Sequence, residues 1–301
     1  MTEKIKITFL GTSDSVPSAE RNHTGILLSY GFENILIDCG EGTQRQFRKA
    51  KLNPCKLTKI LITHWDLDHI LGIPGLISTL GFSGYNRELE IYGPKGTKKY
   101  IEMILRFFHL KNKIKLKVIE VAKGIFFENK DFCLCAEKMV HGVSCNAYCF
   151  CEKTKLKIDK KKLKKFKIAE GKHLQNLKQG KDIVYCGKKI KAKDLIYSGE
   201  AKKICFVLDT RFNSRIKNFV KDSDLLISES EFSKEIKDIA YKHKHLTAEQ
   251  VGKIAKSAKV KKLILTHVSQ RYSKDFNVIL REAKKIFKNT ILAKDLMGVE
   301  I

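Results

Sequence analysis

An apolar run that ends in a dense group of possible metal ligands constrains this chain most. The segment Ile60-Leu-Ile-Thr-His-Trp-Asp-Leu-Asp-His69 reads as a buried strand followed at once by two histidines and two carboxylates. A sheet holds such side chains rigid while the loop turns them toward one point. Imidazole and carboxylate together suit Zn²⁺, Mn²⁺ or Fe²⁺ better than Mg²⁺. The segment therefore predicts a metal site with His64, Asp66, Asp68 and His69 as candidate ligands, against the simpler reading of a solvated loop.

Three further ligand-type residues also stand at the ends of apolar runs. His141 follows Met139 and Val140, Asp209 ends the run 204–208, and His267 ends the run 263–266. Any one of them alone would more often be a packed or hydrogen-bonded polar residue. A shared centre explains the repetition, and the seven residues suffice for two metal ions with Asp209 as a bridge. Two ions about 3.5 to 4 Å apart acidify a bound water and neutralise an attacked phosphoryl or carbonyl oxygen, which is hydrolytic chemistry.

The charge of the chain favours a polyanionic partner. It carries 59 Lys and Arg against 33 Asp and Glu, a net charge of +26. Residues 153–193 alone hold 16 lysines against the three acids Asp159, Glu170 and Asp182. Lysine outnumbers arginine, so compositional bias explains part of the total, and the clustering is the stronger evidence. Nucleic acid is the first expected partner and an anionic membrane surface the second.

Several protein classes are excluded by pattern. No apolar run reaches the roughly 18 to 20 residues of a membrane span, and Met1–Ile5 is a charged lead into a strand rather than a signal peptide. The nine cysteines are scattered, which predicts reduced thiols in a cytoplasmic protein. Zinc bound by Cys133, Cys135 and the run 145–151 is an alternative. Their alternating apolar surroundings instead favour paired strands in which cysteine serves as a small hydrophobic residue.

The order of elements predicts an α/β (α+β) fold with packed sheets flanked by helices. Residues 152–195 interrupt this order, so we expect one domain over residues 1–301 with an inserted flexible arm at 152–195. Thr247 and Gln250 have the spacing of a helix capping box. Phe107, Phe108 and Phe126 are expected in the core. The expected strands span 4–10, 25–30, 34–38, 59–63, 88–92, 203–208, 224–228 and 261–266, and the expected helices span 42–51, a segment ending near 80, 94–109, 247–259 and 274–288.

The chain resembles the ribonuclease Z family of the metallo-β-lactamase fold superfamily, whose members process the 3′ end of transfer RNA. The resemblance runs nearly end to end, and the last of its motifs is the most specific. The similar segments are Phe9-Leu-Gly-Thr12, Pro17 with Arg21-Asn22, Asp38-Cys-Gly-Glu-Gly-Thr-Gln44, Leu71-Gly-Ile-Pro-Gly-Leu76, Tyr92-Gly-Pro-Lys-Gly96, Asp209-Thr-Arg211, His245-Leu-Thr-Ala-Glu-Gln250 and Leu265-Thr-His-Val-Ser-Gln-Arg-Tyr272.

The resemblance implies an αββα sandwich of two mixed sheets and a zinc-dependent endoribonuclease that cuts precursor transfer RNA just after the discriminator base. It implies two Zn²⁺ per subunit, with Mn²⁺ or Fe²⁺ possible, and a homodimer. His64, His141 and Asp209 would bind one metal, and Asp68, His69, Asp209 and His267 the other. Asp68 would accept the proton of the attacking water, and Glu229 and His245 would help protonate the leaving oxygen. The RNA-binding residues would be Arg21 near the acceptor end and Lys161, Lys162, Lys164, Lys165 and Lys172 in the arm.

Three positions depart from the family pattern. Asp66 stands where the family has histidine, and its shorter side chain is expected to weaken or exchange the first metal. Ser228 replaces a histidine before Glu229, and Ala169–His173 replaces a proline-rich tip of the arm. Two alternatives stay open: a related metal-dependent phosphodiesterase with another substrate, and an RNA-binding homologue without catalysis.

Overall fold

The computed structural model describes residues 4–171 and 173–301 of the chain. The expectation for the first residues of the amino terminus therefore falls partly outside the described residues. The described chain forms two compact units, which are treated separately below. The larger comprises residues up to 126 together with 134–150 and 203–301, and the smaller comprises 127–133 and 151–202.

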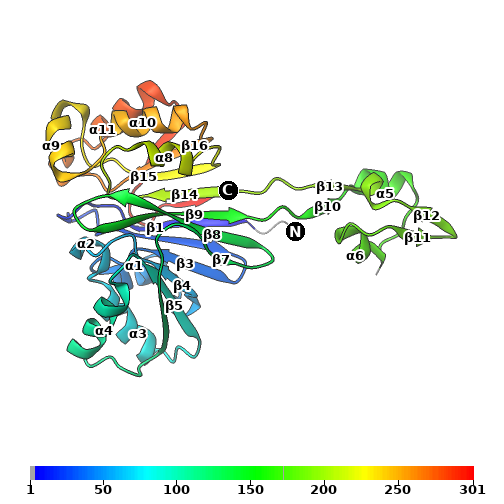
Figure 1. Cartoon of the computed structure of the whole chain (residues 1–301), viewed down its shortest axis with the longest axis horizontal. Coiled ribbons are helices and arrows are strands. Elements are labelled where there is room, and N and C mark those ends of the chain that lie inside the picture. The colour runs from blue at the N-terminus through cyan, green and yellow to red at the C-terminus, as the bar shows by residue number, and fades with distance from the viewer. Residues whose placement is uncertain (1–3, 172) are drawn as a thin grey trace. The chain divides into compact units, whose positions relative to one another are not determined.

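The larger unit is built on two seven-stranded sheets (Figure 1). In the first sheet, β3, β4, β5 and β6 run parallel and the remaining pairs are antiparallel. Its order is β18 (Gly298–Glu300), β1 (Ile5–Gly11), β2 (Gly25–Tyr30), β3 (Glu33–Ile37), β4 (Lys59–Leu61), β5 (Glu88–Gly93) and β6 (Lys115–Glu120).

The second sheet has a parallel half in which β14, β15, β16 and β17 are neighbours. These strands are nearly continuous apolar runs because both of their faces are covered, and Phe206, Ile227 and Ile264 are buried. The order is β17 (Thr290–Leu292), β16 (Lys262–Thr266), β15 (Leu225–Glu229), β14 (Lys203–Val207), β9 (Ser144–Glu152), β8 (Phe132–Val140) and β7 (Gly124–Glu128).

Helices cover the outer face of each sheet, which gives the expected αββα sandwich (Figure 1). The first sheet carries α1 (Thr43–Lys49), α2 (Leu67–Ile70), α3 (Ile73–Phe82) and α4 (Thr97–Phe107); the second carries α8 (Ser214–Phe219), α9 (Lys237–His243), α10 (Ala248–Ser257) and α11 (Asn277–Ile286). Short 3₁₀ turns span Pro54–Lys56, Lys234–Ile236 and Gln270–Tyr272. Leu10, Leu36, Phe47, Ile60 and Leu76 lie in the cluster between the first sheet and its helices. The two sheets meet where the Tyr148 hydroxyl donates to the carbonyl of Ile62 at 2.7 Å.

The sequence located the main elements to within a few residues. The capping box at α10 is confirmed, since Thr247 Oγ1 accepts from Gln250 N at 3.3 Å and Gln250 Oε1 accepts from Thr247 N at 2.9 Å. The core assignment of two phenylalanines is wrong. Phe107 is 77% exposed because it lies on the outward face of α4 with Tyr100 and Met103, and Phe108, at which the helix ends, is also exposed.

The smaller unit has its own apolar core of Leu163, Ile168, Leu177, Ile183 and Leu195. Two short antiparallel strand pairs and three helices surround this core. They are β10 (Leu156–Ile158) paired with β13 (Ile196–Ser198), β11 (Ile183–Tyr185) paired with β12 (Lys188–Ile190), α5 (Lys160–Lys165), α6 (His173–Lys178) and α7 (Ala192–Leu195). The lysine-rich segment is therefore folded around buried leucines and isoleucines, and most of its described lysines are exposed.

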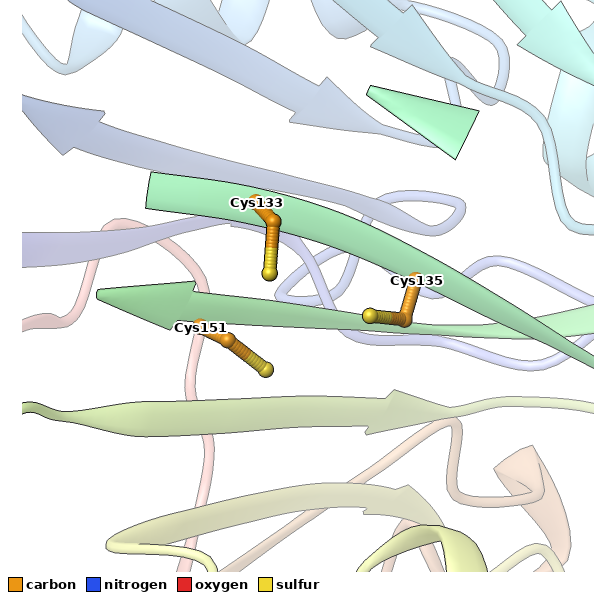
Figure 2. Close-up of side chains that lie close together, drawn as sticks. All are labelled: Cys133, Cys135 and Cys151. Carbon is orange, nitrogen blue, oxygen red and sulfur yellow. The ribbon is translucent and has the colours of Figure 1, made fainter. Parts of the chain in front are cut away.

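The expectation of nine reduced thiols is wrong for two of them. Cys149 on β9 and Cys205 on β14 form a disulfide, because neighbouring strands bring their Cα atoms to 4.2 Å. Cys145, which was also considered as a zinc ligand, donates to the Asp209 carbonyl at 3.2 Å. Cys133 and Cys135 on β8 lie near Cys151 on β9, with sulfur atoms within 4.8 Å of one another (Figure 2). The paired strands expected for these residues are present, since β8 and β9 are neighbours.

Within the residues that the structure describes, the helices are too short or too polar to cross a lipid bilayer.

Candidate metal and catalytic site

The ligand-type residues predicted from strand ends converge at one edge of the larger unit. His64 follows β4, His141 follows β8, Asp209 follows β14 and His267 follows β16. Asp68 and His69 lie in the short helix α2 that continues from β4. The adjacent carboxyl ends of parallel strands lie on the same side of a sheet, which explains why residues far apart in sequence meet here.

One group consists of His64, His141 and Asp209, whose donor atoms lie within 4.8 Å of one another. His64 Nε2 is 3.6 Å from Asp209 Oδ2. In the described part of the chain this buried nitrogen has no hydrogen-bond partner. A buried polar atom without a partner is costly, so the arrangement fits a ligand at this position.

A second group consists of Asp68, His69, Asp209 and His267. His69 Nε2 and His267 Nε2 lie 3.5 and 3.4 Å from Asp209 Oδ1, and His267 Nε2 lies 3.2 Å from Asp68 Oδ2. Asp209 Oδ1 is buried without a hydrogen-bond partner among the described residues. Asp209 thus turns one oxygen to each group, which is the geometry that a bridging ligand requires. These two groups are the same sets that the resemblance implies.

Asp66 is placed beside the first group rather than inside it. Its Oδ2 lies 3.1 Å from His141 Nε2 and 3.5 Å from His64 Nε2, and its side chain is 41% exposed. The ring of His141, at hydrogen-bonding distance, and the nearby ring of His64 hold the pKa of Asp66 well below its ordinary value. An ionised carboxylate therefore faces the ring nitrogens of two members of the first group.

The pKa shifts in the site favour an ionised Asp209 beside a protonated His267. Burial alone would lower the pKa of His267, but Asp209 and the hydrogen bond to Asp68 raise it to about 9. Burial likewise opposes the ionised form of Asp209, yet His267, His69 and His64 hold its pKa well below the ordinary range. The pKa of His64 is lowered by burial and by His69. Cations bound here would replace protons on these rings, which makes metal affinity dependent on pH.

Groups behind the ligands fix their orientation. Asp38 Oδ2 lies 2.7 Å from His69 Nδ1 and accepts from Thr63 Oγ1 at 2.7 Å. Thr63 Oγ1 also lies 3.0 Å from His64 Nδ1. Gly40 allows the loop after Asp38 to pass under α2, because a Cβ there would clash with the carbonyl oxygen of Asp68. Such supporting contacts set tautomer and ring direction at metal sites.

The predicted pair of Glu229 and His245 stands next to the second group. Glu229 Oε1 accepts from Thr210 N at 2.7 Å, and Glu229 Oε2 lies 3.1 Å from His245 Nδ1. Burial would lower the pKa of His245, but Glu229, by charge and hydrogen bond, and the hydrogen bond to Glu231 raise it to about 12. The ring is therefore protonated at neutral pH, which suits a proton donor.

Members of both groups and His245 line one cleft of about 430 Å³. Its wall includes Asp66, Asp68, His141, Asp209, His245 and His267, together with the loop 14–16 and Arg271. Arg271 stacks its guanidinium 5.0 Å from the Phe232 ring centre and lines the cleft as a cation. A phosphodiester entering here would meet both donor groups and a positive charge.

The residues predicted to bind RNA fall into three cases. Lys161, Lys162, Lys164 and Lys165 are exposed on α5, and Lys172 lies outside the described residues. Arg21 is only 5% exposed, donates to Thr12 Oγ1 at 2.7 Å and stacks 4.2 Å from the Phe276 ring centre. This geometry gives Arg21 a role in packing the loop 12–22, and its contact with the acceptor end stays a prediction.

Sequence reasoning missed Asp38 as an orienting group, and Glu231 and Arg271 on the cleft wall. Asp38 lay inside a recognised motif, directly after a predicted strand. Glu231 stands two residues beyond Glu229, which was the available signal. Arg271 lay within the motif that ends at Tyr272, but no pattern in the sequence alone predicts that its side chain lines the cleft.

Comparison with known proteins places this geometry in a family. Residues 5–285 match the family model described as "Anti-Pycsar protein Apyc1". The ribonuclease Z of Methanothermobacter thermautotrophicus is 38% identical over 298 residues, which cover 99% of this chain and 97% of that protein. The chain belongs to the ribonuclease Z family.

Solved structures agree with this assignment. Human tRNase Z, short form, superposes with a TM-score of 0.71 at 25% identity and covers 98% of each chain. The metallo-β-lactamase fold protein YhfI from Bacillus subtilis gives a TM-score of 0.71 at 20% identity over 99% of this chain and 100% of that one, which supports the fold alone. As a ribonuclease Z, the chain is an endoribonuclease of the metallo-β-lactamase fold, and the donor groups at its strand ends fit metal-dependent chemistry.

Proposed function

We propose that this ribonuclease Z removes the 3′ trailer of precursor transfer RNA by hydrolysis just after the discriminator base. The product carries a 3′-hydroxyl. One observation carries the proposal: two donor groups share Asp209, and members of both line a single cleft together with His245, which Glu229 contacts at 3.1 Å.

Two Zn²⁺ ions suit the donor chemistry, with Mn²⁺ or Fe²⁺ as substitutes. His64, His141 and Asp209 would hold one ion beside Asp66, and Asp68, His69, Asp209 and His267 would hold the other. Bound there, the ions would supply an acidified water and neutralise charge on the scissile phosphate. The buried atoms without hydrogen-bond partners, His64 Nε2 and Asp209 Oδ1 in the described chain, support this assignment.

Asp68 and His245 have complementary proton roles in this proposal. Burial would raise the pKa of Asp68, but His69 and His267 hold it well below its ordinary value, so the carboxylate is ionised and orients the attacking water. Asp68 then accepts the proton of that water. His245, protonated and held at Nδ1 by Glu229, donates a proton to the leaving 3′ oxygen of the discriminator nucleotide, which becomes the 3′-hydroxyl, while the phosphate stays on the trailer.

The lysines of α5 are proposed as an exosite for the transfer RNA body. Lys161, Lys162, Lys164 and Lys165 are exposed and follow one another around a single buried residue, Leu163. Lysine contacts to phosphates add affinity without reading sequence. The exosite would therefore bind transfer RNAs in general, and the cleft would select the cut.

A homodimer in the cytoplasm completes the proposal. Tyr100, Met103 and Phe107 are exposed at the i, i+3 and i+7 positions of α4, so they form one apolar stripe. A contiguous exposed apolar surface commonly marks a protein interface. The second copy of this chain is the proposed occupant of that stripe.

Cleavage of a 3′-extended precursor transfer RNA, with bound metal counted on the same preparation, tests the function. We expect a single cut after the discriminator base, lost in Asp68→Ala. No cut with either zinc or manganese, despite a folded protein that binds RNA, would refute the proposal. Hydrolysis of a generic phosphodiester alone would favour a phosphodiesterase with another substrate, and binding without hydrolysis would favour a silent homologue.

A further inference from the structure

The histidines of the two donor groups are held from behind, with one exception. His69 Nδ1 lies 2.7 Å from Asp38 Oδ2, His64 Nδ1 lies 3.0 Å from Thr63 Oγ1, and His141 Nδ1 lies 3.4 Å from the Lys244 carbonyl. His267 Nδ1 is buried and, within the described chain, makes no hydrogen bond. Glu231 Oε2 faces it at 3.7 Å.

Backbone contacts hold Glu231 beside His267. Glu231 follows β15, and its carbonyl accepts from Ser269 N at 3.2 Å, two residues beyond His267. Ser230 N donates to the Thr266 carbonyl at 3.0 Å, so the loops after β15 and β16 are joined on both sides of the two side chains. His267 itself has a φ of 52°, a left-handed conformation that this support stabilises.

The same carboxylate oxygen also contacts the proposed proton donor. Glu231 Oε2 lies 3.0 Å from His245 Nδ1, the same nitrogen that Glu229 Oε2 contacts at 3.1 Å. Glu231 is only 8% exposed and lies on the wall of the cleft. Burying a carboxylate costs free energy unless polar partners compensate, and a neutral side chain would pack this position at lower cost. The carboxylate is therefore retained for what it contacts.

We propose that Glu231 is a positioning residue that orients His267 toward the metal site and His245 toward the leaving group with a single carboxylate. With Nε2 of His267 turned to the donor group, its proton lies on Nδ1, and a small closure of the 3.7 Å separation lets Nδ1–H donate to Glu231. A carboxylate behind a metal-binding histidine fixes its tautomer and increases its basicity. The role toward His245 rests on the proposed function, whereas the role toward His267 requires only metal binding.

The test measures metal affinity and ring tautomer in the full-length chain, without RNA. Glu231→Ala, Glu231→Gln and the control Glu235→Ala, an exposed position in the 3₁₀ turn that follows, are titrated with Zn²⁺ against a competing chelator. We expect about 10- to 100-fold weaker binding of one ion in Glu231→Ala. Glu231→Gln, which keeps an acceptor oxygen and the side-chain volume, should recover part of the loss, and Glu235→Ala should match the parent chain.

Nitrogen NMR of the labelled histidine rings gives a second readout that packing alone would not change. The Nδ1 signal of His267 in the zinc-loaded chain should shift in Glu231→Gln, at unchanged melting temperature. The proposal would be overturned if Glu231→Gln kept both the zinc affinity and the His267 signals of the parent chain. This holds whether Glu231→Ala folds and binds zinc like the parent chain or fails to fold. If the parent chain fails to cleave precursor transfer RNA while these shifts appear, the proposed function fails and the orienting role of Glu231 toward His267 stands.

Discussion

Asp38 holds His69 from behind: its Oδ2 lies 2.7 Å from Nδ1 of that ring, and both side chains are fully buried. Asp38 does so from a left-handed backbone with a φ of 56°. The carboxylate also accepts from the amide and the hydroxyl of Thr63. One residue outside the donor set thus fixes the ring of a proposed ligand and the strand end that precedes His64.

Asp38→Asn should weaken metal binding about 10- to 100-fold. The amide keeps the size of the side chain and tolerates a left-handed backbone, but it removes the charge that attracts the Nδ1 proton of His69. Chelator competition with Zn²⁺ measures the loss. Asp222→Asn is the matched control, because Asp222 has a φ of 55° and is exposed. Equal affinity in the two variants would contradict the orienting role of Asp38.

Asp66→His should increase the occupancy of the first proposed metal position. Asp66 Oδ2 lies 3.1 Å from His141 Nε2, so a longer imidazole at this position can reach the ion that His64 and His141 would hold. The metal content measured after dialysis should rise toward two ions per chain in Asp66→His and fall in Asp66→Ala, each relative to the parent chain. If all three proteins retain two ions, Asp66 has no part in holding the metal.

The protonation of His245 should make cleavage persist at alkaline pH. The folded pKa of His245 is raised to about 12 against an ordinary value of 6.5. Because the protonated ring is favoured in the folded chain, its contribution to the free energy of unfolding is fully present below pH 6.5 and is lost as pH rises toward 12. Cleavage rates from about pH 6 to 9.5 should therefore show no loss of a proton donor in the parent chain, whereas Glu229→Gln should introduce one within this range. A parent profile that already falls near pH 7 would contradict the assignment.

Arg21→Ala should reduce stability more than RNA affinity. The variant removes a buried charged hydrogen bond to Thr12 and the stacking on Phe276, and the expected loss is about 2 to 3 kcal/mol of unfolding free energy. Urea denaturation and a binding assay on the same preparation separate the two effects. Arg21→Lys should be nearly as unstable, because lysine lacks the planar fork. A variant of normal stability with weak RNA binding would restore the direct contact first expected.

Replacing Lys161, Lys162, Lys164 and Lys165 with alanine should flatten the salt dependence of transfer RNA binding. Each lysine that no longer neutralises a phosphate lowers the slope of log K against log salt by about one, so a change of about 2 to 4 is expected. Leu163 is retained to preserve the core of the smaller unit. Alanine at Lys274, Lys284, Lys285 and Lys288, all exposed on the larger unit, removes the same number of charges and is the control. Equal slopes in the two variants would remove α5 from the exosite.

The main strands and the positions of the proposed ligands could be predicted from the sequence, because both depend on local pattern. A buried parallel strand needs a continuous apolar run, and a ligand at its end follows directly, as at His64 and His267. Supporting contacts were less accessible, because Asp38 meets His69, and Glu231 meets His245, only after distant strands have paired. The burial of Arg21 has the same cause: Thr12 and Phe276 are brought to it by the fold.

The predictions for Phe107 and Phe108 of α4, and for Cys149 and Cys205, were wrong because these features also depend on tertiary structure. Composition predicts that a phenylalanine is buried, but the exposure of Phe107 depends on which face of α4 turns outward. Likewise, the partner of Cys149 is set by the order of strands β9 and β14, which no spacing in the sequence specifies.

The bond between Cys149 and Cys205 joins residues 56 positions apart and so closes the chain around residues 151–202. A protease that cuts once inside this closed loop would produce two peptides that still travel as one molecule. They would separate only when a reductant opens the bond. The lysine-rich insertion is therefore tethered at both ends independently of the continuity of its own backbone, and a nicked chain retains every residue of the cleft and of α5 in one covalent body.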